Sequence, residues 1–86
     1  MLLSMKTAIR TSGQLGPVLR ALRQAQGLTQ SALGQRLGLS QERMSAIERV
    51  PETITVQQLI TVLMALDAEL AVVPRTPPAA ESQGDW

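Results

Sequence analysis

The side chains that can bind or react in this sequence are chiefly amides, hydroxyls, guanidinium groups, carboxylates and the amine of Lys6, because its 86 residues include neither histidine nor cysteine. Without histidine the usual general base and the commonest metal ligand are missing. Without cysteine there is no thiolate and no disulfide bond, which is typical of the reducing cytoplasm. There is also no glycine-rich phosphate loop. We therefore expect a cytoplasmic binding protein rather than an enzyme, with no metal ion and no cofactor.

Charge is distributed unevenly along the chain, although the net charge is only +1. Residues 1–43 include six basic residues and one acidic residue, whereas residues 44–86 include two basic and six acidic residues. A basic half favours a polyanionic partner, although a solvated basic surface would explain the same residues almost as well. No apolar stretch approaches the ~20 residues of a membrane span, so no membrane partner is expected.

Residues 28–48, LTQSALGQRLGLSQERMSAIE, predict two short helices that the three residues Gly38, Leu39 and Ser40 separate. Such a short link forces the two helices to cross steeply. Gly34 is small enough for a close contact between the helix backbones, and Gly38 can adopt the positive φ that ends the first helix. Small, capping and apolar residues therefore coincide as they do in a helix-turn-helix motif.

Four helices are expected around one core, since apolar residues recur at helical spacing between capping residues. The predicted capping residues are Ser12, Thr29, Ser40 and Thr55, with Gln58 completing a capping box at the fourth helix. The apolar residues expected to face the core are Leu15, Val18, Leu19, Leu22, Ala25, Leu33, Leu37, Leu39, Met44, Ile47, Leu59, Ile60, Leu63, Met64 and Leu66.

The segment after the fourth helix, AELAVV at residues 68–73, predicts a short β-strand that Pro74 ends. A single strand in a helical domain has no partner within its own chain, so its backbone groups would pair with a second copy. A frayed extension of the fourth helix is the alternative. We therefore expect a homodimer, with an interface formed by Leu70, Ala71, Val72 and Val73.

From Leu15 to Leu66 the chain resembles the Xre/lambda-repressor-like family of helix-turn-helix regulators, most specifically over residues 29–48. The resemblance implies a mostly α-helical fold of four helices whose second motif helix enters the major groove of double-stranded DNA. Ala32 departs from the family pattern, which usually has a glutamate there in a local cap. The implied base-contacting residues are Gln41, Glu42, Ser45 and Ala46, and the implied phosphate-contacting residues are Gln30, Arg43 and Arg49.

The chemistry of three residues bears on these roles. Gln41 offers a donor and an acceptor that suit the edge of adenine, whereas Glu42 can only accept, for example from cytosine N4. A solvated Glu42 near a helix N-terminus is the competing interpretation, because the helix dipole favours negative charge there. Glu48 falls on the inward edge of the same helix, where an unpaired charge would cost several kcal/mol. The family resemblance pairs it with Arg23, so we expect a structural ion pair.

The whole chain resembles HipB-type antitoxins. The features are the segment TSGQLGPVLRALRQAQGLTQ leading into the motif, the segment DAELAVVP after the last helix, and a tail that ends in Trp86. The resemblance implies a dimer that binds an inverted-repeat operator, represses its own operon and binds a HipA-type serine/threonine kinase toxin. A plain regulator without a toxin partner and an adaptor that binds only protein are the alternatives.

The sequence thus divides into four predicted parts. These are an N-terminal arm (residues 1–11), a helix-turn-helix domain (12–67), a dimerising strand (68–74) and a tail of proline and small polar residues (75–86). Trp86, the only aromatic residue, is expected to anchor the toxin or to mark the tail for a protease. The alternatives are an inert end and a ring that packs loosely on its own domain.

Overall fold

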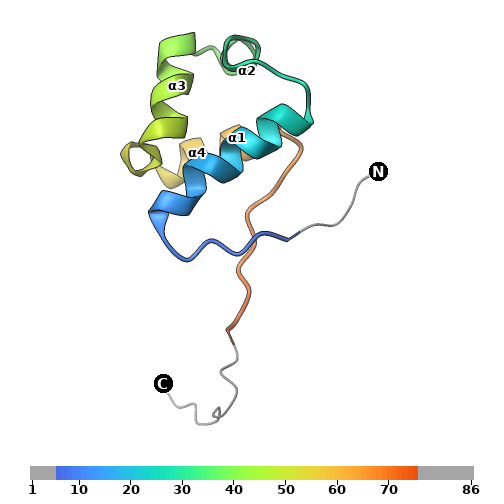
Figure 1. Cartoon of the computed structure of the whole chain (residues 1–86), viewed down its shortest axis with the longest axis vertical. Coiled ribbons are helices and arrows are strands. Elements are labelled where there is room, and N and C mark those ends of the chain that lie inside the picture. Colours follow the sequence, from blue (N-terminus) through green and yellow to red (C-terminus); the bar gives the residue numbers. More distant parts are fainter. Residues whose placement is uncertain (1–5, 76–86) are drawn as a thin grey trace.

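The computed structural model describes residues 6–75, which fold into four α-helices and two short 3-10 helices (Figure 1). The helix pair α2 and α3 crosses steeply, α3 also packs on α1, and α2 also packs on α4. Within this part of the chain no helix has the length and apolar character needed to cross a membrane. The helices are α1 (Leu15–Ala25), α2 (Gln30–Leu37), α3 (Gln41–Arg49) and α4 (Val56–Ala65), with 3-10 turns at Ser12–Gln14 and Pro51–Thr53.

Side-chain caps begin α2, α3 and α4 at the residues that the sequence predicts. The Thr29 hydroxyl accepts from the Ala32 N–H at 3.0 Å, and the Ser40 hydroxyl accepts from the Arg43 N–H at 3.1 Å. Thr55 and Gln58 form the reciprocal capping box at α4. Each cap satisfies backbone donors that an isolated helix end leaves unpaired, so the helix boundaries follow from local chemistry.

The start of α1 differs from the expectation, because Ser12 does not cap it. Ser12 lies in the 3-10 turn, where the Gln14 side chain accepts from the backbone N–H groups of Arg10 and Thr11 at 2.7 and 3.0 Å. The Ser12 hydroxyl instead donates to Glu52 Oε2 at 2.8 Å. This contact ties the turn before α1 to the 3-10 turn before α4.

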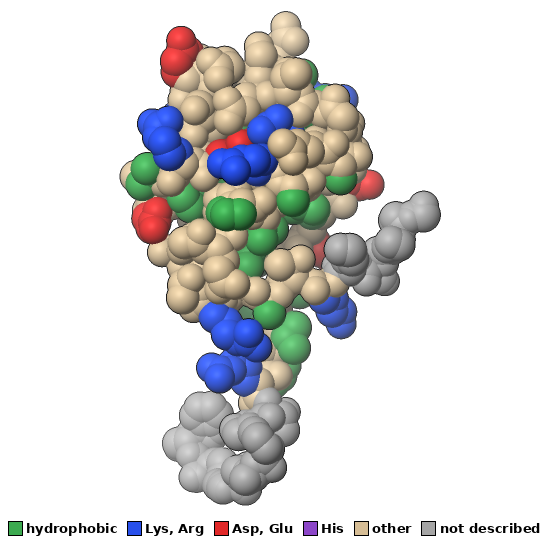
Figure 2. Space-filling model, viewed as in Figure 1, with side chains coloured by type: hydrophobic (Ala, Val, Ile, Leu, Met, Phe, Trp, Pro, Cys, Tyr) green, Lys and Arg blue, Asp and Glu red, His purple; other side chains and the backbone are tan. Residues whose placement is uncertain are grey.

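Beyond α4 the chain turns at Asp67, whose φ of 61° is left-handed, and leads away from the helices to Arg75 (Figures 1 and 2). The Ala68 N–H closes the helix by donating to the Leu63 carbonyl at 2.8 Å, so α4 does not extend into this segment. Within residues 6–75 of this single chain no strand is assigned. Val72 is 93% exposed, and Leu70 and Val73 are exposed as well. The paired strand thus stays a prediction that needs a second chain.

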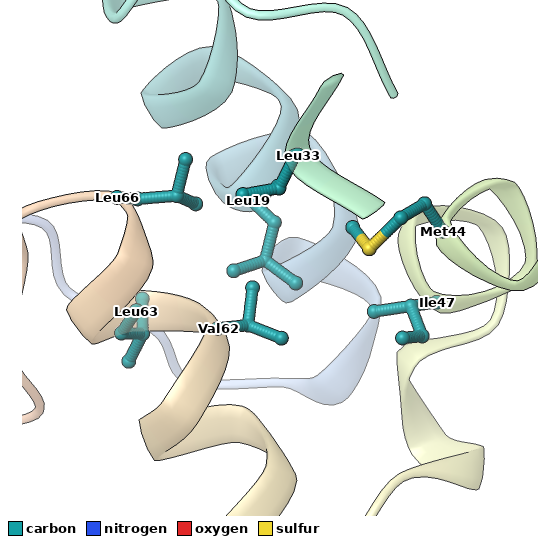
Figure 3. Packing of buried hydrophobic residues seen from close by; sticks show 7 residues of the cluster. All are labelled: Leu19, Leu33, Met44, Ile47, Val62, Leu63 and Leu66. Carbon is teal, nitrogen blue, oxygen red and sulfur yellow. The ribbon is translucent and has the colours of Figure 1, made fainter. Parts of the chain in front are cut away.

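One core joins all four helices, with Leu19 of α1 at its centre (Figure 3). Burying a side chain of this size stabilises the fold by ~1.5–3 kcal/mol, so this cluster is the main source of stability. The buried apolar residues are Leu19, Leu33, Met44, Ile47, Val62, Leu63 and Leu66.

Three of the predicted core positions are wrong. Ala25, Ile60 and Met64 are exposed, Met64 to 68%. On α4 the face toward the core instead includes Val62, which the periodicity had not selected. Apolar residues occur on several sides of α4, and only the packing of α4 against the other helices decides which side is covered.

Candidate nucleic-acid interface

The crossing of α2 and α3 depends on Gly34 and Gly38. Gly38 ends α2 with a φ of 72°, and the next residue, Leu39, donates its N–H to the Gly34 carbonyl at 2.7 Å. A Cβ atom on Gly34 would lie 2.6 Å from the Leu39 carbonyl oxygen and 3.2 Å from that of Ser40. Any side chain at residue 34 would therefore push α3 away from α2, so glycine sets how closely the motif packs.

A second close approach, between α1 and the end of α3, was not predicted from the sequence. A Cβ atom on Gly16 would collide with the carbonyl oxygen of Glu48. Gly16 is buried and precedes Pro17 at the start of α1. The only signal in the sequence was a glycine inside a helical apolar pattern, which often marks a packing contact.

Arg23 of α1 and Glu48 of α3 meet in a buried bidentate ion pair. Arg23 Nε donates to Glu48 Oε2 at 2.6 Å and Arg23 Nη2 donates to Oε1 at 3.1 Å. Both residues are almost covered, with exposed fractions of 8% and 3%. Arg23 Nη1 also donates to the Leu28 carbonyl at 2.8 Å, so the guanidinium is held on two sides. The pair connects α3 to the body of the domain.

Glu48 is ionised at neutral pH. Burial by itself raises the pKa of this carboxyl, but hydrogen bonds from Arg23 and Gln30 outweigh that effect, helped by the positive charges of Arg23 and Arg20. Arg20 Nε lies 3.9 Å from Oε1. The pKa of Glu48 is therefore held below its ordinary value. An ionised carboxylate can only accept hydrogen bonds.

Two glutamine side chains extend this ion pair to the surface. Gln30 Nε2, at the start of α2, donates to Glu48 Oε1 at 3.0 Å. Gln41 Nε2, at the start of α3, donates to Gln30 Oε1 at 2.8 Å. We call this series of hydrogen-bonded side chains, Glu48–Gln30–Gln41, the amide relay. The sequence suggested a role for each glutamine separately, but nothing in it indicated that they touch.

An open hollow lies where α1 ends and where α2 and α3 begin, and the described residues that line it include no acidic side chain. The first turn of α2 contributes backbone N–H groups without intrahelical partners, which favour an anion together with the helix dipole. The hollow thus suits a phosphate group beside Gln30. The lining residues are Arg23, Gln24, Gly27, Leu28, Thr29, Gln30, Ser31 and Gln41.

The surface of α3 displays the remaining predicted contact residues. Gln41, Glu42 and Arg49 are exposed, whereas Arg43, Ser45 and Ala46 are half-buried. Arg49 Nη1 donates to the Ser45 hydroxyl at 3.3 Å, so these two side chains are joined, one turn apart. Figure 2 shows basic side chains interspersed with acidic ones on the face in view, so the charge asymmetry of the sequence does not produce a uniformly basic surface there.

The other predicted site residues lie away from this face or beyond the structure. Leu70, Ala71, Val72 and Val73 follow α4 and are all exposed. Trp86 lies outside the described residues.

Comparison with known proteins identifies relatives of this architecture. A helix-turn-helix domain family matches residues 14–73, which is more than half of the chain. A HipB–O1–O2 complex is 26% identical with a TM-score of 0.72, covering 80% of this chain and 100% of that chain. A HipB–O4 20mer complex and a HipA–HipB–O2–O3 complex are each 26% identical with a TM-score of 0.71, covering 80% of this chain and 97% of theirs. A search of curated proteins found no match.

The family match and the structural likeness agree with the steep crossing that Gly34 permits between α2 and α3. The matched range spans all four helices and reaches past α4 to Val73. The chain therefore belongs to the helix-turn-helix domain family and is an Xre-like helix-turn-helix protein of the HipB type.

Proposed function

We propose that the chain is a sequence-specific DNA-binding antitoxin that represses its own operon and binds a HipA-type serine/threonine kinase toxin. The observation that carries the proposal is the exposed polar face of α3. The crossing with α2 leaves this face on the surface of a domain whose fold is of the HipB type. A helix in this position of a helix-turn-helix domain fits the major groove, with its N-terminal residues toward base edges.

In this proposal the start of α3 recognises bases and its flanks hold the DNA backbone. Gln41 reads a base edge, with Glu42, Ser45 and Ala46 beside it. Gln30 and the first turn of α2 bind one phosphate in the hollow, while Arg43 and Arg49 contact others. Support comes from the lack of acidic side chains among the described residues that line the hollow.

Selection from a pool of randomised duplexes tests the DNA-binding function. The purified chain should enrich an inverted repeat whose half-sites are centred about one helical turn, roughly 10 base pairs, apart or a multiple of that. Its affinity should fall steeply with salt, because binding releases counterions from the phosphates. If no duplex is enriched and binding does not depend on salt, the chain is an adaptor for proteins only.

The same proposal makes the chain a homodimer through its C-terminal segment. Leu70, Val72 and Val73 are apolar and exposed, and the stripe of Val56, Ile60 and Met64 on α4 is exposed too. Pairing of two such segments would satisfy backbone groups that one chain leaves open and would cover apolar surface.

The toxin partner is supported by the likeness to the HipB of a HipA–HipB–O2–O3 complex. Co-expression with the neighbouring gene tests it. A kinase-like neighbour that co-purifies as one complex supports an antitoxin, whereas a chain that binds its operator and retains no kinase is a plain regulator.

Trp86 is proposed to anchor the tail to the toxin or to mark it for a protease. Because it is the only tryptophan of the chain, the tryptophan fluorescence of the chain comes from this residue alone. The emission should shift to the blue on addition of toxin if Trp86 binds the kinase. Deletion of residues 84–86 should alter toxin affinity or cellular lifetime and leave operator binding unchanged. A loss of thermal stability on deletion would instead place Trp86 in the fold.

A further inference from the structure

We infer that Glu48 is a positioning residue for base recognition: through Gln30, it sets the order in which Gln41 presents its amide oxygen and its N–H to a base edge. The inference rests on the proposed function, in which α3 enters the major groove. It assigns the buried ion pair a role in specificity beyond that of holding α3 in place.

The direction of the amide relay follows from the carboxylate. Both Glu48 oxygens accept from Arg23, and Oε1 also accepts from Gln30 Nε2 at 3.0 Å. Because a carboxylate cannot donate, Gln30 must turn its amino group toward Glu48 and its oxygen outward. That oxygen can only accept, so Gln41 turns its own amino group toward Gln30, at 2.8 Å. Each orientation determines the next.

The anchor of the relay is rigid. Glu48 is 3% exposed and bound at two atoms by Arg23, whose guanidinium is also bound to the Leu28 carbonyl. Rotation of the carboxylate would leave a charge buried without a partner, which costs several kcal/mol. Gln30 is half-buried, whereas Gln41 is exposed. The order imposed at the buried end is therefore transmitted to a side chain that faces solvent.

The order matters because an amide has nearly the same shape in its two flipped orientations but an opposite pattern of hydrogen bonding. After donating one N–H to Gln30, Gln41 retains a second N–H and a carbonyl oxygen. Adenine offers N7 as an acceptor beside the N6 amino donor, so one order matches both atoms and the reverse order opposes both. Guanine offers two acceptors and cannot satisfy the amide oxygen. The relay thus favours A·T at the base pair that Gln41 contacts.

Glu48→Gln tests the direction of the relay while nearly preserving side-chain shape. Because both oxygens of the wild-type Glu48 accept from Arg23, either orientation of the new amide places its amino group against one Arg23 donor, and neither orientation is fixed. With the amino group at the Oε1 position, it donates to Gln30 and the orientation of both glutamines is reversed. The position read by Gln41 is identified first, as the one whose preference Gln41→Ala removes. There the wild-type chain should favour A·T over other pairs by roughly 5- to 150-fold. The Glu48→Gln variant should reduce that ratio to within about three-fold.

A double variant, Glu48→Gln with Gln30→Glu, should rescue the preference. It moves the acceptor-only group to residue 30, where it again accepts from the amino group of Gln41. Affinity for all duplexes should fall, because the carboxylate at residue 30 repels the DNA phosphate beside it. The ratio of affinities for A·T and for the other base pairs should nevertheless return to that of the wild type. A merely structural role of Glu48 predicts no such recovery of the ratio.

Gln30→Met keeps the inference testable if Glu48→Gln does not fold. This variant cuts the relay and leaves the pair of Arg23 and Glu48 intact, and it should lower the A·T ratio with little change in melting temperature. A chain that enriches no duplex would overturn the proposed function and this inference with it. A chain that enriches duplexes, but whose A·T ratio is the same with and without Gln30→Met, would overturn this inference alone.

Discussion

Gln30 and Gln41 have the same side chain, but their different surroundings give them different roles. Gln30 is half-buried and has its amide nitrogen bound to Glu48 and its oxygen bound to Gln41. Gln41 is exposed and retains an oxygen and an N–H for a ligand. Arg43, two residues after Gln41 on α3, has a charge but no pair of complementary donor and acceptor groups. We therefore expect Gln41 to discriminate between bases and Arg43 to contribute affinity without discrimination.

Substitutions at these two residues should separate the roles. Gln41→Ala should cost about 1–3 kcal/mol of binding at one base pair and relax the preference there, because a bidentate contact is lost. Arg43→Ala should weaken binding to all duplexes by a similar factor. It should also reduce the slope of affinity against salt concentration by about one released ion. Fluorescence anisotropy at several salt concentrations measures both effects. Indistinguishable behaviour of the two variants would contradict the assignment.

At the scale of elements, α3 is held at both ends by contacts with little freedom. Gly34 lets α2 approach the turn that leads into α3, and Gly16 lets α1 approach the carbonyl of Glu48 near its end. The Glu48 side chain then reaches Arg23 across the same α1–α3 boundary. Since these contacts are backbone approaches and a buried ion pair, the orientation of α3 is set by the fold before any ligand binds.

The ion pair should make stability depend on pH in a defined direction. The pKa of Glu48 is lowered in the folded chain, so its stabilising contribution is fully present above the unfolded pKa near 4.5 and disappears as the pH falls through the folded pKa. Urea unfolding should therefore show the wild type more stable than Glu48→Gln at pH 7, with the difference shrinking below about pH 4.5.

Glu52 does not disturb this comparison. Its pKa is also lowered, first by a backbone hydrogen bond and then by the Ser12 hydroxyl, but it is present in both proteins and its effect cancels. A difference in the free energy of unfolding that stays constant from pH 7 to pH 3 would show that the charge of Glu48 is not what stabilises α3.

At the scale of the whole molecule, residues 6–75 form a helical body followed by a segment whose apolar residues Leu70, Val72 and Val73 are exposed in the part of the chain that the structure describes. A chain of this size buries only about 60–65% of its unfolded surface, so its stability is small. A second copy paired along residues 68–73 would cover the segment and bring two α3 helices to one DNA duplex, which is what an inverted repeat requires.

Proline in this segment should prevent dimerisation without harming the helical body. Because alternate residues donate across a strand pair, Ala71→Pro and Val72→Pro are compared, and at least one should raise the dimer dissociation constant steeply in sedimentation experiments. Val72→Thr keeps the backbone N–H and the branched side chain and should remain dimeric. If both proline variants sediment as unchanged dimers, the segment is not the interface.

Much of this fold could be predicted without coordinates, because its helix ends are local. The caps at Thr29, Ser40 and Thr55 join atoms three residues apart, so the sequence alone determines where α2, α3 and α4 begin. The tight link at Gly38 likewise implied the steep crossing. The exposed face of α4 was not determined in this way, since apolar residues on several of its sides leave periodicity without a preferred direction.

What only the tertiary structure decided are the contacts between residues far apart in sequence. Gly16 meets the backbone of Glu48, and the amide relay joins side chains 18 and 11 residues apart. The sequence alone determined that glutamines begin α2 and α3 and that a buried glutamate needs a partner. The relay exists because the crossing of α2 and α3 places Glu48 within hydrogen-bonding reach of Gln30, and no local rule encodes that distance.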